Sequence, residues 1–140
     1  LHKEYRRQRQ MCIRDRYGLP YSEYFIWFDD REYTLRLTAR CPGVQVLDSV
    51  VVHDMGDNRG VNFAMVDRKS LWKFSYGVRN EASWQLHHRG FLYFMEFGAR
   101  LFVSLHRGRV PLDLRAKLLG KWVKGITFNP KIKYPEAEAA

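Results

Sequence analysis

An aromatic run that ends in two adjacent carboxylates restricts the folding of this chain more than any other segment. The run covers residues 24–28 and reads Tyr-Phe-Ile-Trp-Phe. Its apolar character predicts a short buried strand or a strand-like entry. Asp29 follows at an N-cap position with Glu32 three residues later, and this capping-box pattern predicts a helix that extends to about Arg40. The Cys-Pro-Gly break at 41–43 ends that helix.

The remaining segments predict strands first and helices later. The β-branched runs 44–47 and 50–53 are typical of strands. The polar segment 54–60 predicts an ordinary solvated connection, and a mobile loop over an acceptor site is the alternative. Helices are expected at 67–88, 91–106 and 111–125. This order predicts an α/β fold, in which a sheet edge with helices packed on or beside it is followed by a helical, basic tail.

The composition is that of one folded domain. With 140 residues, of which 46% are hydrophobic and 15% aromatic, the chain can bury a real core. Cys12 and Cys41 match neither a metal spacing nor a disulfide framework, which favours a reducing compartment. The apolar run 91–105 is interrupted by charges and is too short to span a bilayer, so we expect a protein that is soluble or bound to a surface.

The net charge of +9 is concentrated at the two ends of the chain. Residues 1–16 hold six Lys or Arg and two acids, but they resemble translated sequencing-adapter read-through and are excluded from the fold reasoning. A genuine basic arm is the alternative for this segment. Residues 97–133 hold nine Lys or Arg and one acid. A phosphate-bearing partner is therefore expected for the tail: a lipid headgroup, a lipid-linked acceptor or nucleic acid.

Residue chemistry alone leaves two interpretations of Asp29 and Asp30 open. The helix dipole favours negative charge at the first turn by ~0.3–1 kcal/mol, so both carboxylates can stay ionised. An ionised carboxylate beside an apolar wall can act as a general base toward a hydroxyl. The other interpretation is structural, with Asp29 as the helix cap and Asp30 in the favourable field of the dipole. Acidic first turns are common, and the residues alone favour this second interpretation.

Three motifs occur in a fixed order between Leu19 and Asn80. They are the stretch 25–36 (FIWFDDREYTLR), the run 50–53 (VVVH) and the stretch 75–80 (SYGVRN). Together they resemble the C-terminal part of family 2 glycosyltransferases, in particular the rhamnosyl- and galactofuranosyltransferase-like branch. The chain departs from this pattern at Phe28, which is bulkier than the residue common at that position, and at Ser75, where the family has Tyr. These departures leave the donor and the acceptor open.

The resemblance implies that residues 17–66 are the C-terminal part of a GT-A-type catalytic domain and that residues 67–140 form a C-terminal helical region. It implies inverting transfer of a sugar from a UDP- or dTDP-linked nucleotide sugar to a polysaccharide, glycan or lipid-linked acceptor, as in cell-wall polysaccharide biosynthesis. The chain would then be a fragment without the nucleotide-binding half, inactive by itself. The implied location is the cytoplasm, peripherally on the inner face of the cell membrane.

The resemblance also implies roles for single residues. It places the catalytic base on Asp30, with Asp29 beside it as cap and acceptor contact. Substrate contacts are expected from four further residues: Trp27, Glu32, Arg79 and Asn80. For Arg79 and Asn80, anchoring of their helix is the favoured alternative, because an Arg inside a helix is more often structural.

His53 corresponds to a metal-ligating histidine in the galactofuranosyltransferase-like members. An imidazole together with carboxylates suits Mn²⁺ or Mg²⁺, and such an ion assists the departure of the diphosphate as a Lewis acid. A strand-end histidine bonded to backbone is the alternative. The partner aspartates would lie in the missing half, so the metal site is expected to be incomplete in this chain.

The last predicted helix carries an apolar arc and a lysine face. The arc consists of Leu112, Ala116, Leu119, Val123 and Ile126, and the lysine face of Lys117, Lys121 and Lys124. This pattern is typical of an interfacial helix on an anionic membrane, and a helix packed on a sheet with its lysines in water is the alternative. The rival to the enzyme hypothesis is thus a non-catalytic basic module that binds anionic membrane or nucleic acid. Because no nucleic-acid-binding motif is present, no nucleic-acid partner is expected.

Overall fold

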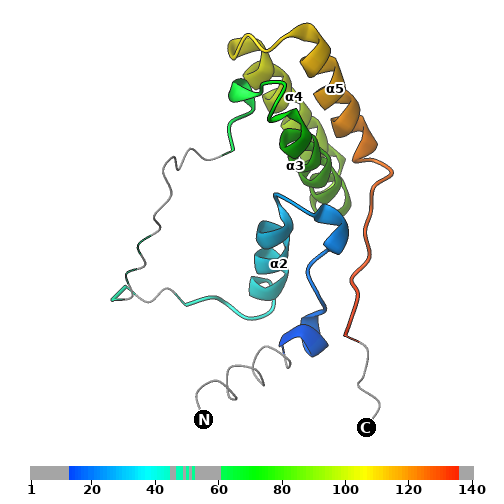
Figure 1. The fold of residues 1–140 in the computed structure, drawn as a ribbon. Coiled ribbons are helices and arrows are strands. Elements are labelled where there is room, and N and C mark those ends of the chain that lie inside the picture. Colours follow the sequence, from blue (N-terminus) through cyan, green and yellow to red (C-terminus); the bar gives the residue numbers. More distant parts are fainter. Residues whose placement is uncertain (1–12, 45–46, 49, 51, 53–60, 136–140) are drawn as a thin grey trace.

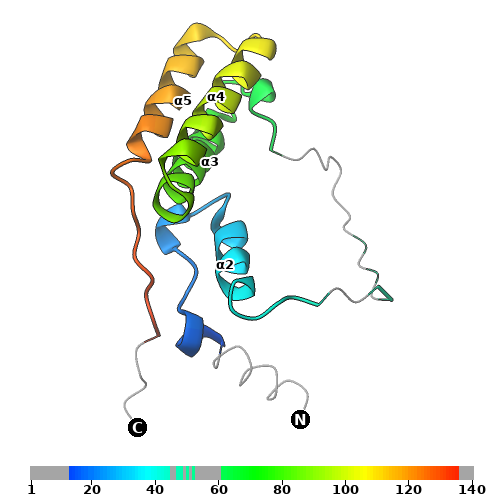
Figure 2. The same cartoon turned by 180° about the vertical axis from the view of Figure 1, so that it is seen from behind.

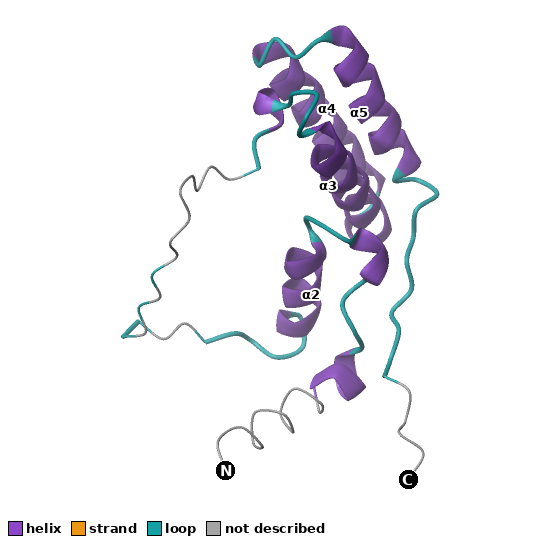
Figure 3. Cartoon of the chain, viewed as in Figure 1, coloured by secondary structure: helices purple, strands orange, loops and turns teal. Residues whose placement is uncertain are grey.

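The computed structural model describes residues 13–44, 47–48, 50, 52 and 61–135. Every regular element in these residues is a helix, and the described part of the chain contains no strand (Figure 3). The prediction of an α/β, GT-A-type fold is therefore wrong. The apolar segments that predict strands form a tight turn or lie exposed instead.

The largest unit is a bundle of α3 (Leu71–Trp84), α4 (Phe91–Arg107) and α5 (Leu112–Lys124), which lie side by side (Figures 1 and 2). α3 continues into a π-helical turn, η3 (Gln85–Arg89), and Gly90 with a φ of 103° leads into α4. The apolar faces of the helices meet in one core, since helices bury their apolar stripes against each other. Its buried members are Val66, Phe74, Val78, Ala82, Phe94, Phe97, Leu101, Leu105, Val110, Leu114 and Leu118.

The contact between α4 and α5 depends on a glycine. A Cβ atom at Gly98 of α4 would lie 2.6 Å from the indole ring of Trp122 on α5. Trp122 stacks on Phe94 with ring centroids 4.5 Å apart, and its Nε1–H donates to the Phe94 carbonyl at 3.2 Å. The missing side chain at position 98 thus lets the two helices approach closely enough to seat the indole.

The aromatic run 24–28 is not a strand. Its first residue ends the short 3₁₀ turn η1 (Ser22–Tyr24), and Phe25, Trp27 and Phe28 follow with φ angles of 59°, 62° and 73°. Each left-handed non-glycine residue costs about 1–3 kcal/mol. The prediction of a strand fails because the chain turns sharply here, and the turn needs support from elsewhere in the fold.

The prediction of a helix after the aromatic run is correct, whereas the predicted capping box is wrong. α2 (Asp29–Thr38) begins at Asp29 itself, and its N-cap is Phe28 in the left-handed conformation, without a side-chain cap hydrogen bond. Because Asp29 lies inside the helix, Glu32 is not in the position from which it could cap the helix. Its carboxylate pairs instead with Arg36, one turn later on the same face of the helix.

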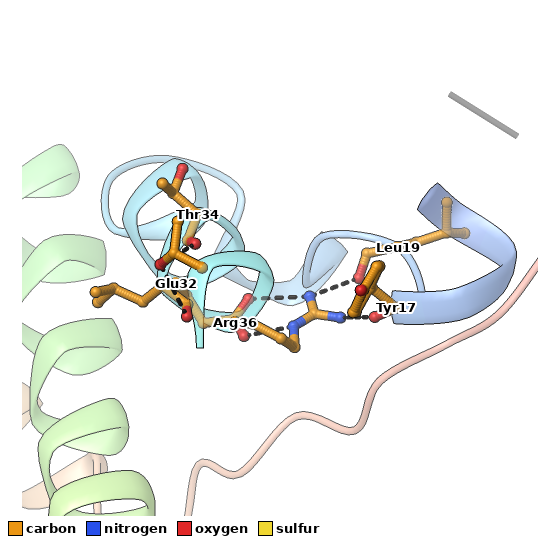
Figure 4. A network of polar contacts seen from close by, with 7 residues as sticks. Tyr17, Leu19, Glu32, Thr34 and Arg36 are labelled. Carbon is orange, nitrogen blue, oxygen red and sulfur yellow. Dashed lines mark hydrogen bonds and ion pairs between the residues drawn. The ribbon is translucent and has the colours of Figure 1, made fainter. Parts of the chain in front are cut away.

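Glu32 and Arg36 form a buried polar network beneath α2. Glu32 is only 1% exposed, and its Oε1 lies 2.8 Å from Nε of Arg36. Figure 4 shows the guanidinium of Arg36 between this carboxylate and the backbone carbonyls of Tyr17 and Leu19, to which it donates hydrogen bonds. A buried carboxylate is costly unless it is paired. This pair therefore fixes α2 onto the segment that precedes the aromatic run.

The C-terminal tail, residues 126–135, returns from α5 toward the start of the described chain (Figure 1). The N–H of Leu19 donates to the Lys133 carbonyl at 2.8 Å, and Nζ of Lys133 lies 2.5 Å from a carboxylate oxygen of Glu23. Phe128 of the tail packs against an aromatic cluster whose buried members are Tyr21, Tyr24 and Phe28. The tail therefore closes a second, smaller core between the bundle and α2.

The two β-branched runs predicted as strands lie partly outside the described residues. Of the first run, Val44 and Leu47 are described, and of the second, Val50 and Val52; none is in a strand and all are exposed, Val44 at 88%. Isolated β-branched residues form a strand only when a partner pairs with them, and none of the described residues does so. His53 and the segment 54–60 lie outside the described residues, as do residues 1–12.

The helical half matches the prediction in position but not in the face that α5 buries. The buried residues of α5 are Leu114 and Leu118, whereas the predicted apolar arc is largely exposed, with Leu112 at 77% and Val123 at 51%. α5 thus has two apolar faces, one in the core and one on the surface. No described helix combines the length and the apolar character needed to cross a bilayer.

Candidate functional site

A cavity of about 290 Å³ opens between the start of α2 and the middle of α3. It is lined by Trp27, Phe28, Asp30, Arg31, Val61, Phe63, Gly77 and Glu81. The aromatic turn forms one wall, while Asp30 of α2 and Glu81 of α3 contribute carboxylates and Arg31 contributes a guanidinium. The cavity therefore combines an apolar surface with two carboxylates.

Asn80 holds the turn in its strained conformation. Its side-chain Nδ2 donates to the carbonyls of Tyr24 at 2.9 Å, Ile26 at 3.2 Å and Trp27 at 2.9 Å. Asn80 is fully buried, so these bonds replace the water that would otherwise solvate the carbonyls. One amide on α3 thus satisfies three backbone groups of the turn and offsets part of its strain.

Arg79 supports the same turn from the neighbouring position. Its guanidinium donates to the Glu23 carbonyl at 2.8 Å and to Oδ1 of Asn80 at 2.9 and 3.1 Å. The last two bonds orient the Asn80 amide so that its NH₂ group faces the turn. Arg79 and Asn80 therefore stand behind the turn, and neither lines the cavity that contains Asp30.

Gly77 allows the turn to lie directly on α3. A Cβ atom at this position would lie 2.7 Å from the ring of Trp27. Trp27 also meets Phe74 edge to face, with ring centroids 4.7 Å apart. The indole is thus fixed between two residues of α3, and the aromatic wall of the cavity is rigid.

Asp30 is exposed in the first turn of α2, at the rim of the cavity. Its Oδ1 accepts the backbone N–H of Arg31 at 2.7 Å. The Arg31 guanidinium lies over the Phe28 ring, 5.2 Å from its centroid, and none of the ion pairs between described residues involves Asp30. One carboxylate oxygen is therefore held by the helix, and the other has no hydrogen-bond or ion-pair partner among the described residues.

The structure brings together only some of the residues predicted for the site. Trp27 and Asp30 line one cavity, and Asp29 is the half-buried neighbour of Asp30. Glu32 was predicted to contact substrate, but its carboxylate is buried in an ion pair with Arg36 and does not line the cavity. His53 lies outside the described residues.

Glu81 is a residue of this cavity that the sequence reasoning missed. Burial raises the pKa of its carboxyl above the ordinary value, and the charges of Arg31 and Arg100 partly oppose that rise. Glu81 directly follows the third motif, and it lies one helical turn after Gly77 on the same face of α3. The sequence contains only a helix glycine followed one turn later by an acid, and the approach of the aromatic turn to that glycine is seen only in the structure.

The described residues do not assemble a metal site by themselves. No group of three or more His, Cys, Asp or Glu side chains in the described part of the chain is arranged to hold an ion. Asp30 and Glu81 supply two carboxylates at the cavity, short of the ligand number that Mn²⁺ or Mg²⁺ takes. We therefore assign no step of a reaction to a metal held by these residues.

Comparison of the chain with protein-family models, with curated proteins and with solved structures finds no match.

Proposed function

We propose that this chain carries the acceptor side of an inverting sugar transferase, with Asp30 as the general base. The proposal is supported by the order of the three motifs and, most directly, by one observation. Asp30 is an exposed carboxylate at a helix N-terminus, without a cationic side-chain partner among the described residues, beside a cavity walled by Trp27 and Phe28.

The cavity suits a sugar that carries a free hydroxyl. The apolar face of a sugar ring packs on aromatic side chains, and the rigid Trp27 and Phe28 offer such a surface. A hydroxyl at the rim would then donate its hydrogen bond to the free oxygen of Asp30. Glu81, which lines the same cavity, would accept or donate a second hydrogen bond according to its protonation. This arrangement would orient one hydroxyl before the reaction.

The proposed step transfers one proton and exchanges one bond. The acceptor oxygen attacks the anomeric carbon of the donor, and its proton passes to the carboxylate of Asp30. The bond from the anomeric carbon to the nucleotide diphosphate breaks, and the diphosphate leaves with that electron pair. Attack from the side opposite to the leaving group inverts the anomeric configuration. A carboxylate within hydrogen-bond reach of the hydroxyl can accept its proton as a general base.

The test is sugar transfer from a UDP- or dTDP-linked donor by the enzyme that joins this chain to the nucleotide-binding half implied by the resemblance. Asp30→Asn keeps the shape of the side chain and removes its basicity, so we expect kcat to fall by about 10³-fold with little change in donor KM. Asp29→Asn is the matched control and should lose less than about tenfold. An Asp30→Asn variant that keeps its rate within tenfold would rule out this base.

A second proposal, peripheral binding to an anionic membrane, is supported by the exposed apolar side chains of α4 and α5. On α4 they include Phe91 at 63%, Leu92 at 82% and Phe102 at 56%, and on α5 Leu112 and Val123. Lys117 and Lys124 are exposed on the same helix as Leu112 and Val123. An apolar surface flanked by lysines fits anionic lipid, where each lysine contributes roughly 1 kcal/mol. Such binding would place the chain where lipid-linked acceptors lie.

A further inference from the structure

A second cavity, of about 270 Å³, lies between α3 and α5. Its lining consists of Trp72, Ser75, Tyr76, Arg79 and Lys121. No residue lines both this cavity and the one that contains Asp30. Its charged lining also differs: it consists of two cations, whereas the first cavity has two carboxylates and one cation, Arg31.

Helical spacing explains how the lining residues come together. Ser75, Tyr76 and Arg79 lie three, four and seven residues after Trp72, so the four residues share one face of α3. α5 packs beside α3 (Figure 1) and contributes Lys121 to the lining. Two elements that belong to the folded core therefore position the cavity.

The two positive charges of this cavity have no carboxylate partner among the described residues. Arg79 is half-buried, and its hydrogen bonds go to the neutral oxygens of Glu23 O and Asn80 Oδ1. The rings of Phe128 and Tyr76 lie 3.7 and 5.0 Å from the guanidinium carbon. Burial lowers the pKa of Arg79, and the groups that oppose this are tyrosines.

The carboxylate of Glu23, whose backbone carbonyl accepts a hydrogen bond from Arg79, is already engaged. The carboxylate of Glu23 binds Lys133 at 2.5 Å and Ser22 at 3.0 Å. No described ion pair includes Lys121. Removing a cation from water costs free energy, and here no carboxylate of the described residues offsets that cost. A bound anion would offset it, so the two cations favour an anionic ligand.

The remaining lining residues favour an anion that is attached to a ring. Trp72 is 51% exposed, so its indole face is open to solvent at the cavity. The hydroxyl of Ser75 adds a group that can donate to a phosphate oxygen. Aromatic surface next to Arg, Lys and Ser matches a sugar ring with a phosphate group, since the ring stacks and the phosphate takes the charged hydrogen bonds.

We propose that the cavity between α3 and α5 binds the phosphate group of a phosphorylated saccharide, with Arg79, Lys121 and Ser75 on the phosphate and Trp72 against the sugar ring. The site is independent of the function proposed for Asp30, because it lies in a different cavity and requires no catalysis.

The test is a titration of the 140-residue chain with glucose 1-phosphate at low salt, followed by NMR of the tryptophan indole N–H signals. We expect saturable binding in the millimolar range, with a shift of the Trp72 signal, and no shift of the Trp72 signal with glucose. Lys121→Gln should weaken binding about tenfold, as expected for one charged hydrogen bond to phosphate. Lys117→Gln, which removes the same charge one turn earlier on α5 outside the cavity, should leave the affinity unchanged.

Two further variants make the outcome decisive. Trp72→Ala should weaken binding of glucose 1-phosphate more than binding of inorganic phosphate, whereas Lys124→Gln, at an exposed position of α5 outside the cavity, should change neither. Arg79 is unsuitable for this purpose, because it also holds the Glu23 carbonyl. Equal losses in Lys121→Gln and Lys117→Gln, or no saturable shift, would overturn the proposal. So would binding of phosphatidylglycerol vesicles that depends on Lys121 while glucose 1-phosphate does not bind, since the site would then serve a lipid headgroup.

Discussion

Asn80, the last residue of the motif 75–80, forms hydrogen bonds with the strained turn at 24–28. Three backbone carbonyls of the turn depend on its side-chain amide, and the three aromatic residues with positive φ lie in the same segment. An amide can donate twice and is short enough to reach the turn from the helix. Asn80 is therefore needed for the shape of the cavity wall even though it does not line the cavity.

Replacing Asn80 with Asp tests this role with almost no change in shape. The carboxylate cannot donate to the carbonyls of Tyr24, Ile26 and Trp27, and it buries a charge beside them. We expect the free energy of unfolding to fall by about 2–4 kcal/mol in urea denaturation. Asn129→Asp, an exposed position in the tail, should change it by less than about 0.5 kcal/mol. Equal effects of the two substitutions would contradict the role of the amide.

Glu81 makes stability depend on pH. Burial raises its folded-state pKa above the ordinary 4.5, so the native state binds the proton more tightly than the unfolded state. The associated stability is fully present below the unfolded pKa and is lost as the pH rises through the folded pKa. Glu81→Gln removes the ionisation, so its Tm should exceed that of the parent more at about pH 7.5 than at about pH 4.

The control for Glu81 is Glu96→Gln on α4. Glu96 is exposed, and it pairs with Arg100 at 3.7 Å. Exposed pairs of this kind contribute about 0–1 kcal/mol, so thermal unfolding should show no gain from Glu96→Gln at the higher pH. A Tm difference for Glu81→Gln that shrinks with rising pH would contradict the assigned direction.

Among the elements, the helices were predictable and the aromatic segment was not. Apolar residues at helical intervals gave the positions of α3, α4 and α5, and the acidic first turn gave the start of α2. The run 24–28 has the composition of a strand, but its backbone conformation depends on Asn80, which lies far along the chain. A local pattern contains no information about such a partner. The cavity could therefore be predicted at Asp30 and Trp27 but not at Glu81.

Which face of α5 is buried also depends on the helices against which α5 packs. This helix has two apolar stripes, and the sequence pattern indicated the one with more residues, the arc that begins at Leu112, as its apolar face. Leu114 and Leu118 face the core instead, next to Trp122, which fits over Gly98. The seating of that indole fixes the rotation of α5. The predicted arc, which includes Leu112 and Val123, is thereby left on the surface.

The exposed arc predicts membrane binding that depends on single apolar side chains. Val123→Ser should reduce co-sedimentation with phosphatidylglycerol vesicles by about threefold or more, because it removes apolar area from the interface. Val44→Ser is the matched control, since Val44 is even more exposed but lies outside α4 and α5. Binding to neutral phosphatidylcholine should be weak for all forms. Equal losses for Val123→Ser and Val44→Ser would argue against this surface.

At the scale of the whole molecule, the tail joins the bundle to α2. Phe128 stacks with Tyr24 at 6.0 Å between ring centroids, and its carbonyl accepts the hydroxyl of Ser83. The tail thus contacts both the aromatic turn and α3. The cavity with Asp30 and the cavity with Lys121 are therefore held by one continuous structure.

Phe128→Ala should loosen this connection. The substitution removes a half-buried ring from the second core, so we expect a loss of about 1–3 kcal/mol in the free energy of unfolding by denaturant. Tyr134→Ala, an exposed aromatic in the same tail, should lose less than about 0.5 kcal/mol. If Phe128→Ala is as stable as the parent, the tail does not contribute to the core.

The account as a whole depends on the carboxylate of Asp30 acting as a base. Chemical rescue measures this directly in the sugar transferase proposed above, in which this chain is joined to the nucleotide-binding half that the resemblance implies. Asp30→Ala should be almost inactive, and added formate should restore sugar transfer in proportion to its concentration, because a small carboxylate then takes the place of the missing one. Asp29→Ala should show no such response. Full activity of Asp30→Ala without formate would contradict the account.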